Sequence, residues 1–369
     1  MKLLFICGSA EIGRDGVGDY TRRLGEELVN QGHQVKILAI NDNVSAVREE
    51  VFSTEKNQDI AVLRYPSSTT FSDRCYKLDR LLNEYKPDFI SLQYVPYSFQ
   101  DKGIPYEFVK CLGRINKKWN WHIMFHETWL GLSSLSPLKH KVVGFLQRKV
   151  AQWMVKSLDP QVITTSNRLY QMVLEGAKID ATLLPLFSNI QVSSGISAFQ
   201  TELFEKLGIS DSNRTEFVIL GIFGSLHKEY DFYPVLKAEL EKATTANKKL
   251  IFVSFGRMRE LEEFNRLKVS FDSKIKFVLL GELPEASVSV TMRVLDEAIS
   301  CTPMEHIGKS GVYAAMRLHN VKVLLPFSDK IPELEGEIKQ YNIYLHSKPP
   351  YEWSVDYVAL EFVKFLNKI

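Results

Sequence analysis

The first 24 residues, Met1–Leu24 (MKLLFICGSAEIGRDGVGDYTRRL), carry the pattern that decides the fold. The apolar run Leu3–Cys7 is typical of a strand buried on both faces, and the glycine-rich loop Gly8–Gly18 follows it. Apolar residues at i, i+4 and i+8 then predict a helix, which we expect Asp19 to cap. A second apolar run, Val35–Ile40, completes a strand–helix–strand unit, the repeating element of an α/β fold.

Strand-like runs alternate with helical patterns along nearly the whole chain, which predicts parallel sheets covered by helices on both faces. A polar stretch of small residues, Ser188–Ser197, interrupts this alternation and indicates a linker. We therefore expect an α/β fold with two Rossmann-like, doubly wound domains facing each other across a cleft that holds the ligands. The expected division is a first domain at 1–187, a linker at 188–200, a second domain at 201–350, and a C-terminal helix at 351–369 that packs back toward the first domain. Further strands are expected at Phe89–Leu92, His122–Phe125, Val162–Thr165, Leu183–Leu186, Phe217–Phe223, Leu250–Phe255, Ile275–Leu280, Ala298–Cys301 and Val321–Leu325.

The composition narrows the class of protein. A length of 369 residues suits two domains, and a net charge of +2 gives no sign of a nucleic-acid partner. The eight histidines show no metal-binding spacing, so no metal site is expected. No apolar run reaches the ~18 residues of a membrane span. The four cysteines are widely spaced and are interpreted as free thiols. These features predict a cytoplasmic protein in a reducing compartment, with at most peripheral contact at the inner membrane face.

Two features of the first domain are candidate site residues. Gly16 and Gly18 end the glycine-rich loop, where the backbone approaches a ligand closely and the following helix N-terminus favours an anion. The loop is not in the G-x-G-x-x-G register, which argues against a dehydrogenase. His126 follows an expected strand, where it is placed to donate to a sugar hydroxyl or to stabilise developing charge, and the alternative is a structural histidine. The weaker candidates, assigned to the acceptor side, are Gln93, Tyr94 and Glu127.

The second domain offers two loops suited to phosphate. The first follows a strand at Phe223 and contains Gly224, Ser225 and Lys228, with the lysine expected to neutralise a diphosphate leaving group. The second precedes a helix expected at Val312–Leu318, and its candidates are Glu305, Gly308, Lys309 and Ser310. This second loop resembles the end of a P-loop, but Pro303 stands where that motif needs glycine, so an ATPase is rejected.

A basic stretch at 140–156 interleaves apolar and cationic residues at helical spacing. It is a candidate for peripheral contact with anionic lipid, and the alternative is an ordinary core helix with a basic solvated face.

The order of these motifs resembles that of the GT-B glycosyltransferases of family 4 over about 1–327. Gly16-Val17-Gly18 resembles the glycine loop of that family, His126 its strand-end histidine, and Gly224-Ser225-Leu226 with Lys228 its Gly-Arg-Leu step and phosphate-binding lysine. The resemblance implies transfer of a sugar, with retention, from a UDP- or GDP-sugar to a glycan or lipid-linked acceptor in cell-surface polysaccharide or glycolipid synthesis. It implies no tightly bound cofactor, with the first domain on the acceptor side and the second binding the nucleotide-sugar.

The chain departs from this family at two positions. Ser225 replaces the arginine of the Gly-Arg-Leu step. The second of two glutamates that the family spaces along its last motif falls on Tyr313 or Ala314, and neither residue is acidic. These departures keep two alternatives open, namely a non-catalytic nucleotide-sugar-binding or scaffold protein and a GT-B nucleotide-sugar epimerase.

Overall fold

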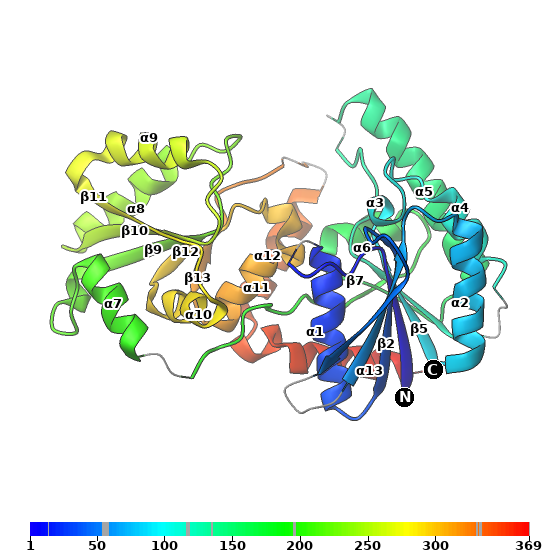
Figure 1. Ribbon diagram of the computed structural model, residues 1–369. Coiled ribbons are helices and arrows are strands. Elements are labelled where there is room, and N and C mark those ends of the chain that lie inside the picture. Colours follow the sequence, from blue (N-terminus) through cyan, green and yellow to red (C-terminus); the bar gives the residue numbers. More distant parts are fainter. Residues whose placement is uncertain are drawn as a thin grey trace. The chain divides into compact units, whose positions relative to one another are not determined.

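The computed structural model in Figure 1 describes residues 1–13, 15–53, 59–115, 119–133, 136–194, 197–329, 331 and 334–368. Arg14 of the glycine-rich loop and residues 195–196 of the expected linker lie outside this set. The chain divides into two compact units, and each is considered by itself. Unit 1 contains Met1–Pro185 and Val355–Ile369, and unit 2 contains Leu186–Ser354.

Unit 1 is built on one mainly parallel sheet. Its described strands, in spatial order, are β3 (Arg48–Ser53), β4 (Asp59–Pro66), β2 (Gln34–Asp42), β1 (Lys2–Cys7), β5 (Phe89–Tyr94), β6 (Trp121–Phe125), β7 (Val162–Thr165) and β8 (Thr182–Leu183). All neighbouring pairs are parallel except β3 with β4. Apart from β3, the order runs outward from β1 in both directions, which is a doubly wound arrangement.

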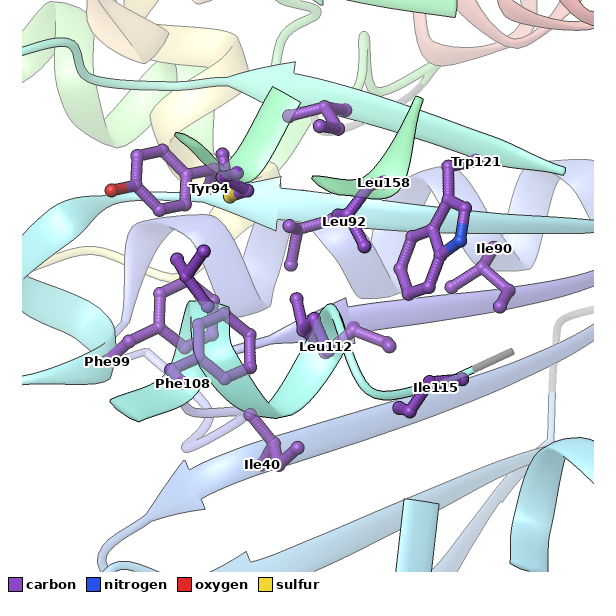
Figure 2. Packing of buried hydrophobic residues seen from close by; sticks show 14 of the residues in the cluster. Ile40, Ile90, Leu92, Tyr94, Phe99, Phe108, Leu112, Ile115, Trp121 and Leu158 are labelled. Atoms are coloured by element: carbon purple, nitrogen blue, oxygen red, sulfur yellow. The ribbon is translucent and has the colours of Figure 1, made fainter. Parts of the chain in front are cut away.

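Helices cover both faces of this sheet. The described helices of unit 1 are α1 (Gly16–Asn30), α2 (Phe71–Tyr85), α3 (Pro96–Phe99), α4 (Tyr106–Leu112), α5 (Leu138–Leu158), α6 (Arg168–Glu175) and α13 (Val355–Leu366). Helix α13 packs beside α1, and its Phe362 ring lies 5.8 Å from Phe5 of β1. On the other face, α2, α4 and α5 supply leucines, phenylalanines and a methionine to one core cluster. In that cluster Phe99 stacks on Phe108 at 4.2 Å between ring centres, as Figure 2 shows.

Unit 2 repeats the plan at a smaller scale. Its described strands, in spatial order, are β11 (Ile275–Gly281), β10 (Lys249–Phe255), β9 (Phe217–Phe223), β12 (Glu297–Ile299) and β13 (Lys322–Leu324), all parallel. Helices α8 (Tyr233–Thr245) and α9 (Leu261–Phe271) pack on one face. The other face is covered by α7 (Ser197–Leu207), α10 (Glu285–Val294), α11 (Gly311–Leu318) and α12 (Glu335–Ser347), with short 3-10 turns at Arg214–Glu216, Asp272–Lys274, Met304–Lys309 and Pro350–Trp353.

The expected strands form, with differences at element ends that have local causes. Asn167 caps α6 as expected, because its side chain accepts from Leu169 N at 2.9 Å. Helix α1 is instead capped by Asp15, which accepts from Gly18 N at 2.6 Å, so the expectation for Asp19 is wrong. Asp19 lies in the first turn and accepts from Gly13 N, closing the loop. Strand β8 ends before Pro185, which has no N–H to donate to a ladder.

The expectation of four free thiols is wrong for one pair, so the cysteines no longer support the expected reducing compartment. Cys75 on α2 and Cys111 on α4 form a disulfide with 6.0 Å between their Cα atoms, although 36 positions separate them in sequence. The neighbouring helices bring the two residues together, which no spacing pattern signals. Cys7 and Cys301 are free. Among the described residues, no helix is long and apolar enough to cross a membrane.

Candidate functional site

The sheet of unit 2 has a topological switch point between β9 and β12. From β9 the chain runs outward through β10 and β11, then crosses to β12 and β13 on the opposite side. The loops that leave the two adjacent strands therefore diverge and open a crevice at their carboxyl ends. A cavity of about 560 Å³ lies there. Its lining comes mainly from the segments that follow these two strands, and the loop after β13 adds Asp329: Phe223, Gly224, Ser225, His227, Glu229, Tyr230, Ser300, Cys301, Thr302, Pro303, His306, Lys309, Val312 and Asp329.

The loop after β9 is shaped by Gly224 and Ser225. Gly224 has φ 98°, a conformation that favours glycine, and its N–H donates to Phe255 O at 2.8 Å. Ser225 Oγ accepts from the backbone N–H groups of Arg259 and Glu260 at 3.0 and 3.2 Å. Ser225 thus ties the loop after β10 to the loop after β9, a role that sequence analysis did not foresee.

Lys228 lies outside the main cavity. It belongs to an adjacent, smaller hollow that also includes Arg257 and Arg259. Its ammonium lies 3.0 Å from Glu260, and 67% of its side chain is exposed. The structure therefore places Lys228 apart from Lys309, and only Lys309 lines the cavity at the switch point.

The loop after β12 brings a helix N-terminus to the cavity. Ser310 caps α11 by accepting from Tyr313 N at 3.2 Å, and Thr302 donates to Ser310 Oγ at 3.0 Å. Lys309 and Val312, on either side of the helix start, both line the cavity. The N-terminal turn of a helix carries partial positive charge, so this wall combines a cation with a dipole suited to an anion.

Glu305 and Gly308 are not among the lining residues. Both carboxylate oxygens of Glu305 are occupied within the protein, because one accepts from Ser328 Oγ and the other from Asp329 N at 3.0 Å. Glu305 is 5% exposed. Glu305 therefore holds the loop that carries Asp329 in place, and it does not line the cavity.

A histidine and an aromatic pair complete the cavity of unit 2. His306 Nε2 lies 3.0 Å from Asp329 Oδ2, and burial lowers the pKa of His306. Tyr230 stacks on Phe327 with 4.2 Å between ring centres, which fixes the orientation of the Tyr230 ring at the cavity wall. An aromatic face, a lysine and two carboxylates, Glu229 and Asp329, thus surround one space.

In unit 1, His126 ends a buried chain of side-chain hydrogen bonds. The five successive contacts measure 2.8, 2.7, 2.8, 2.8 and 3.0 Å. Every member of the chain except Thr164, which lies on β7, comes from β5 or from β6 and the residue after it. All are at most 8% exposed. In order, the chain runs through His126, Gln93, Ser91, His122, Thr164 and Met124.

The chain has one direction because Met124 Sδ can only accept. Thr164 donates to that sulfur, so its oxygen accepts from His122 Nε2–H, and His122 Nδ1 accepts from Ser91. Ser91 in turn accepts from the amide of Gln93, whose oxygen accepts from His126 Nε2–H. His126 is therefore fixed as the Nε2–H tautomer with Nδ1 as its acceptor atom.

Both histidines of this chain are neutral at physiological pH. Burial lowers the pKa of His126 to about 3, and burial together with the nearby His126 lowers the pKa of His122 to about 3. The Nε2–H of His126 is engaged by Gln93, so this ring offers a hydrogen-bond acceptor. The expectation that His126 donates to a sugar hydroxyl is therefore wrong, because its N–H already donates to Gln93 and the other ring nitrogen, Nδ1, can only accept. The Tyr20 ring of α1 contacts His126 edge-on at 4.9 Å, which joins the helix after the glycine loop to this histidine.

The glycines of the first loop have different surroundings. Gly16 begins α1 and a Cβ there would meet nothing, whereas a Cβ at Gly18 would lie 2.6 Å from Ser9 O. At Gly8 a Cβ would lie 2.5 Å from Ser98 O, because α3 packs against the end of β1.

At the end of β2, Asp42 is fully buried and accepts from Ser9, Ala10 N and Arg64. These contacts occupy the acidic position that a dinucleotide site would use.

The acceptor-side candidates separate in the structure. Gln93 is 1% exposed and holds His126, and Glu127 is partly exposed beside it in sequence. Tyr94 is fully buried in the core, 5.3 Å from the Phe125 ring and 6.0 Å from Phe99 (Figure 2). Tyr94 is therefore a packing residue, which corrects its assignment to an acceptor surface.

Sequence analysis missed several residues of these two arrangements. Tyr230, Thr302 and Asp329 lie outside the two loops singled out in the sequence, whereas His227 and His306 lie within those loops but were not chosen as candidates. The sheet order brings all five together. Ser91, His122 and Thr164 did carry a signal, because each is a polar residue inside an otherwise apolar strand. Buried polar groups need partners, so their recurrence on adjacent strands indicates a network. Among the described residues, no cluster of His, Cys, Asp and Glu is arranged to hold a metal ion.

Comparison with known proteins supports the architecture. No protein-family model matches the chain, and no curated protein resembles it in sequence. The Anabaena protein HepE, solved with UDP and glucose, has a TM-score of 0.60 at 13% identity and aligns over all of both chains. The catalytic domain of starch synthase IV from Arabidopsis thaliana, solved with ADP and acarbose, has a TM-score of 0.53 at 11% identity over 100% of this chain and 98% of that one. UDP-GlcNAc 2-epimerase from Neisseria meningitidis, solved with UDP-GlcNAc, has a TM-score of 0.50 at 10% identity over all of both chains.

At such identities the likeness establishes the fold. The chain has the GT-B fold, with two α/β units that each contain a largely parallel sheet.

Proposed function

We propose that this protein is a glycosyltransferase of the hexosyltransferase type. It moves a sugar from a UDP- or GDP-sugar to a glycan or lipid-linked acceptor, with retention, as in family 4, and serves cell-surface polysaccharide or glycolipid synthesis. The observation that carries this proposal is the cavity at the switch point of unit 2, where Lys309 and the N-terminus of α11 meet. No tightly bound cofactor takes part in the proposed reaction.

The cavity suits a nucleoside diphosphate in size and in charge. Its volume of about 560 Å³ falls within the range of small-molecule sites. Lys309 and the first turn of α11 form the wall suited to the two phosphates. The fixed face of Tyr230 suits a base, and the carboxylates of Glu229 and Asp329 suit the hydroxyls of a ribose. Gly224 and Ser225 line the same cavity, Lys228 lies in the adjacent hollow, and Gly308 and Ser310 flank Lys309 in sequence.

In the proposed reaction, the bond between the anomeric carbon and the diphosphate oxygen breaks, and a bond from the anomeric carbon to the acceptor oxygen forms. Negative charge develops on the departing diphosphate, where Lys309 and the helix dipole stabilise it. The proton of the acceptor hydroxyl passes to the departing phosphate. His126 is proposed to accept a hydrogen bond from a sugar hydroxyl at Nδ1, because its other nitrogen is engaged.

Two alternatives each rest on an observation. A nucleotide-sugar epimerase is compatible with the likeness to the Neisseria enzyme. A non-catalytic binding protein is compatible with the start of α11, where Tyr313 and Ala314 are fully buried and offer no acid to a ribose. Both alternatives keep the cavity as a nucleotide-sugar site, and they differ from transfer only in the product.

We place this reaction in the cytoplasm, at the inner face of the membrane, with residues 140–156 as the segment of peripheral contact. A lipid-linked acceptor would be presented at that face.

The identity of the product tests the proposal. The protein is incubated with UDP- and GDP-sugars, with and without an extract of lipid-linked oligosaccharides, and the anomeric protons are followed by NMR. Transfer predicts a new α- or β-linkage of the same configuration as the donor, only when the acceptor is present. An epimerised sugar without acceptor would support the epimerase instead, and an unchanged donor under all conditions would contradict both catalytic functions. Lys309→Ala should lower the rate of product formation, whereas Lys339→Ala, at an exposed lysine of α12, should not.

A further inference from the structure

Helix α5 presents two apolar faces, and only one of them is buried. The buried face consists of Gly144, Gln147, Val150, Ala151, Met154 and Leu158. On the opposite face, Leu138 is 76% exposed, Val142 52%, Phe145 58% and Leu146 43%. These four residues follow the spacing i, i+4, i+7 and i+8, which places them on one side of the helix. We name them the α5 outer patch.

The α5 outer patch lies among cations. Lys139, Lys141, Arg148 and Lys149 fall within or beside it, and 138–158 contains no aspartate or glutamate. The ammonium of Lys149 lies 5.5 Å from the centre of the Phe145 ring, so charge and apolar surface are interleaved side by side. Lysine stems cover apolar surface while their ammonium groups reach outward, which is the arrangement found at a lipid interface.

The position of the helix in unit 1 keeps this surface open. Figure 1 shows the N-terminal turns of α5 extending beyond the body of unit 1, while its C-terminal half lies against α4. The helix therefore differs along its length. The second half, 150–158, packs into the core, whereas the first half, 138–149, buries Gly144 and Gln147 on one face and presents the outer patch on the other.

The charges around the α5 outer patch indicate which kind of partner binds it. Symmetric pairing of two copies would oppose four cations with four cations, which disfavours a dimer through this face. An anionic lipid surface offers both complements, namely negative headgroups for the lysines and acyl chains for the apolar side chains. Exposed single apolar residues are common on soluble proteins, but four on one cationic helical face form a contiguous patch.

We propose that the half-helix 138–149 binds an anionic membrane surface, with Leu138, Val142 and Phe145 entering the headgroup boundary. Lys139 and Lys149 contact the anionic headgroups. This inference rests on the peripheral contact included in the proposed function, while its evidence, the exposed residues of α5, is independent of the sugar-transfer step. It also narrows the contact from the whole basic stretch 140–156 to its first half, extended to Leu138, because Val150 and Met154 are core residues.

Vesicle co-sedimentation of the full chain tests this proposal. The protein should sediment with vesicles that contain phosphatidylglycerol and not with vesicles of phosphatidylcholine alone. Phe145→Ser should lower the partition coefficient about tenfold, the effect of removing one partly inserted phenylalanine. Lys149→Gln should lower it about fivefold, the effect of one cation near an anionic surface.

Matched controls separate a local effect from a general loss of apolar surface. Tyr76→Ser on α2 removes an aromatic ring that is 65% exposed, and Leu360→Ser on α13 removes an aliphatic side chain that is 50% exposed. Both should sediment like the unmodified protein. Equal binding to neutral vesicles, no binding to either kind, or binding that Phe145→Ser leaves unchanged would each overturn the proposal. A dimer in solution that Phe145→Ser disrupts, without vesicle binding, would also overturn it. Nucleotide binding is measured separately, so failure here leaves the unit 2 cavity untouched.

Discussion

Acidification should destabilise unit 1 through His122 and His126, and the size of the effect follows from their burial. The pKa of each imidazole is about 3 in the folded protein, against an ordinary value of 6.5. Because the folded pKa lies below the unfolded one, the unfolded chain takes up the proton first. The stability that each neutral imidazole contributes is therefore complete above pH 6.5 and is lost as the pH falls toward 3.

The magnitude is large enough to measure. Between pH 7 and pH 5, each histidine should lower the free energy of unfolding by about 2 kcal/mol, as linkage predicts for a folded pKa near 3. The two together should lower it by about 4 kcal/mol, in addition to the contribution of carboxylates. His126→Gln and His122→Gln should each remove about 2 kcal/mol of this acid sensitivity, whatever they do to stability at pH 7.

The assay is urea unfolding at both pH values, followed by tryptophan fluorescence. Four of the five tryptophans lie in unit 1, so the signal reports mainly that unit. His140→Gln, at an exposed position of α5, is the matched control and should keep the full acid sensitivity. Parallel pH dependences for the unmodified protein and for both buried-histidine variants would refute the reasoning, because the imidazoles would then titrate alike in the folded and unfolded states.

Three further predictions concern stability. Replacing Cys75 by serine should lower the free energy of unfolding of the oxidised protein by about 4 kcal/mol. This is the chain-entropy value for the loop that the bond between Cys75 and Cys111 closes. An equal denaturation midpoint in the presence and absence of reductant would contradict that bond. Arg64→Met should cost about 3–5 kcal/mol in urea unfolding, because it leaves the carboxylate of Asp42 buried without its charged partner, and a change below the measurement error would show that Asp42 is not ionised. Gly224→Ala should lower the stability of unit 2 by about 1–3 kcal/mol through backbone strain at φ 98°, and an unchanged thermal midpoint would show that the loop relaxes freely.

Much of the fold was predictable because buried parallel strands leave a strong pattern. Phe217–Phe223 forms β9 with the bounds that its apolar run predicts, and Asn167 caps α6 as expected. Two strands were missed, β3 and β4. The sequence of β4 (DIAVLRYP) alternates apolar and polar residues and buries Ile60 and Val62, yet it was not among the expected strands. β3 is an edge strand with the sequence REEVFS, and its charges conceal it from any hydrophobic criterion.

The candidate site was less predictable, for a physical reason. Lys309 was found because it lies just before a helix N-terminus, and this signal can be recognised from the neighbouring residues alone. Tyr230 and Asp329 line the same cavity but lie almost 100 positions apart, and only the order of strands brings their loops together. Likewise, the direction of hydrogen bonding at His126 depends on Met124, whose role as terminal acceptor no sequence motif reveals.

The most direct test of the central claim is calorimetric titration of UDP, GDP and ADP into the full chain and into Lys309→Ala. If the cavity at the switch point of unit 2 is the donor site, at least one nucleotide should bind. Lys309→Ala should then weaken that binding by about 1–3 kcal/mol, the typical cost of losing a charged hydrogen bond. Lys339→Ala should bind as the unmodified protein does. Binding that is equal in Lys309→Ala and the unmodified protein, or no binding of any of the three nucleotides, would contradict the account.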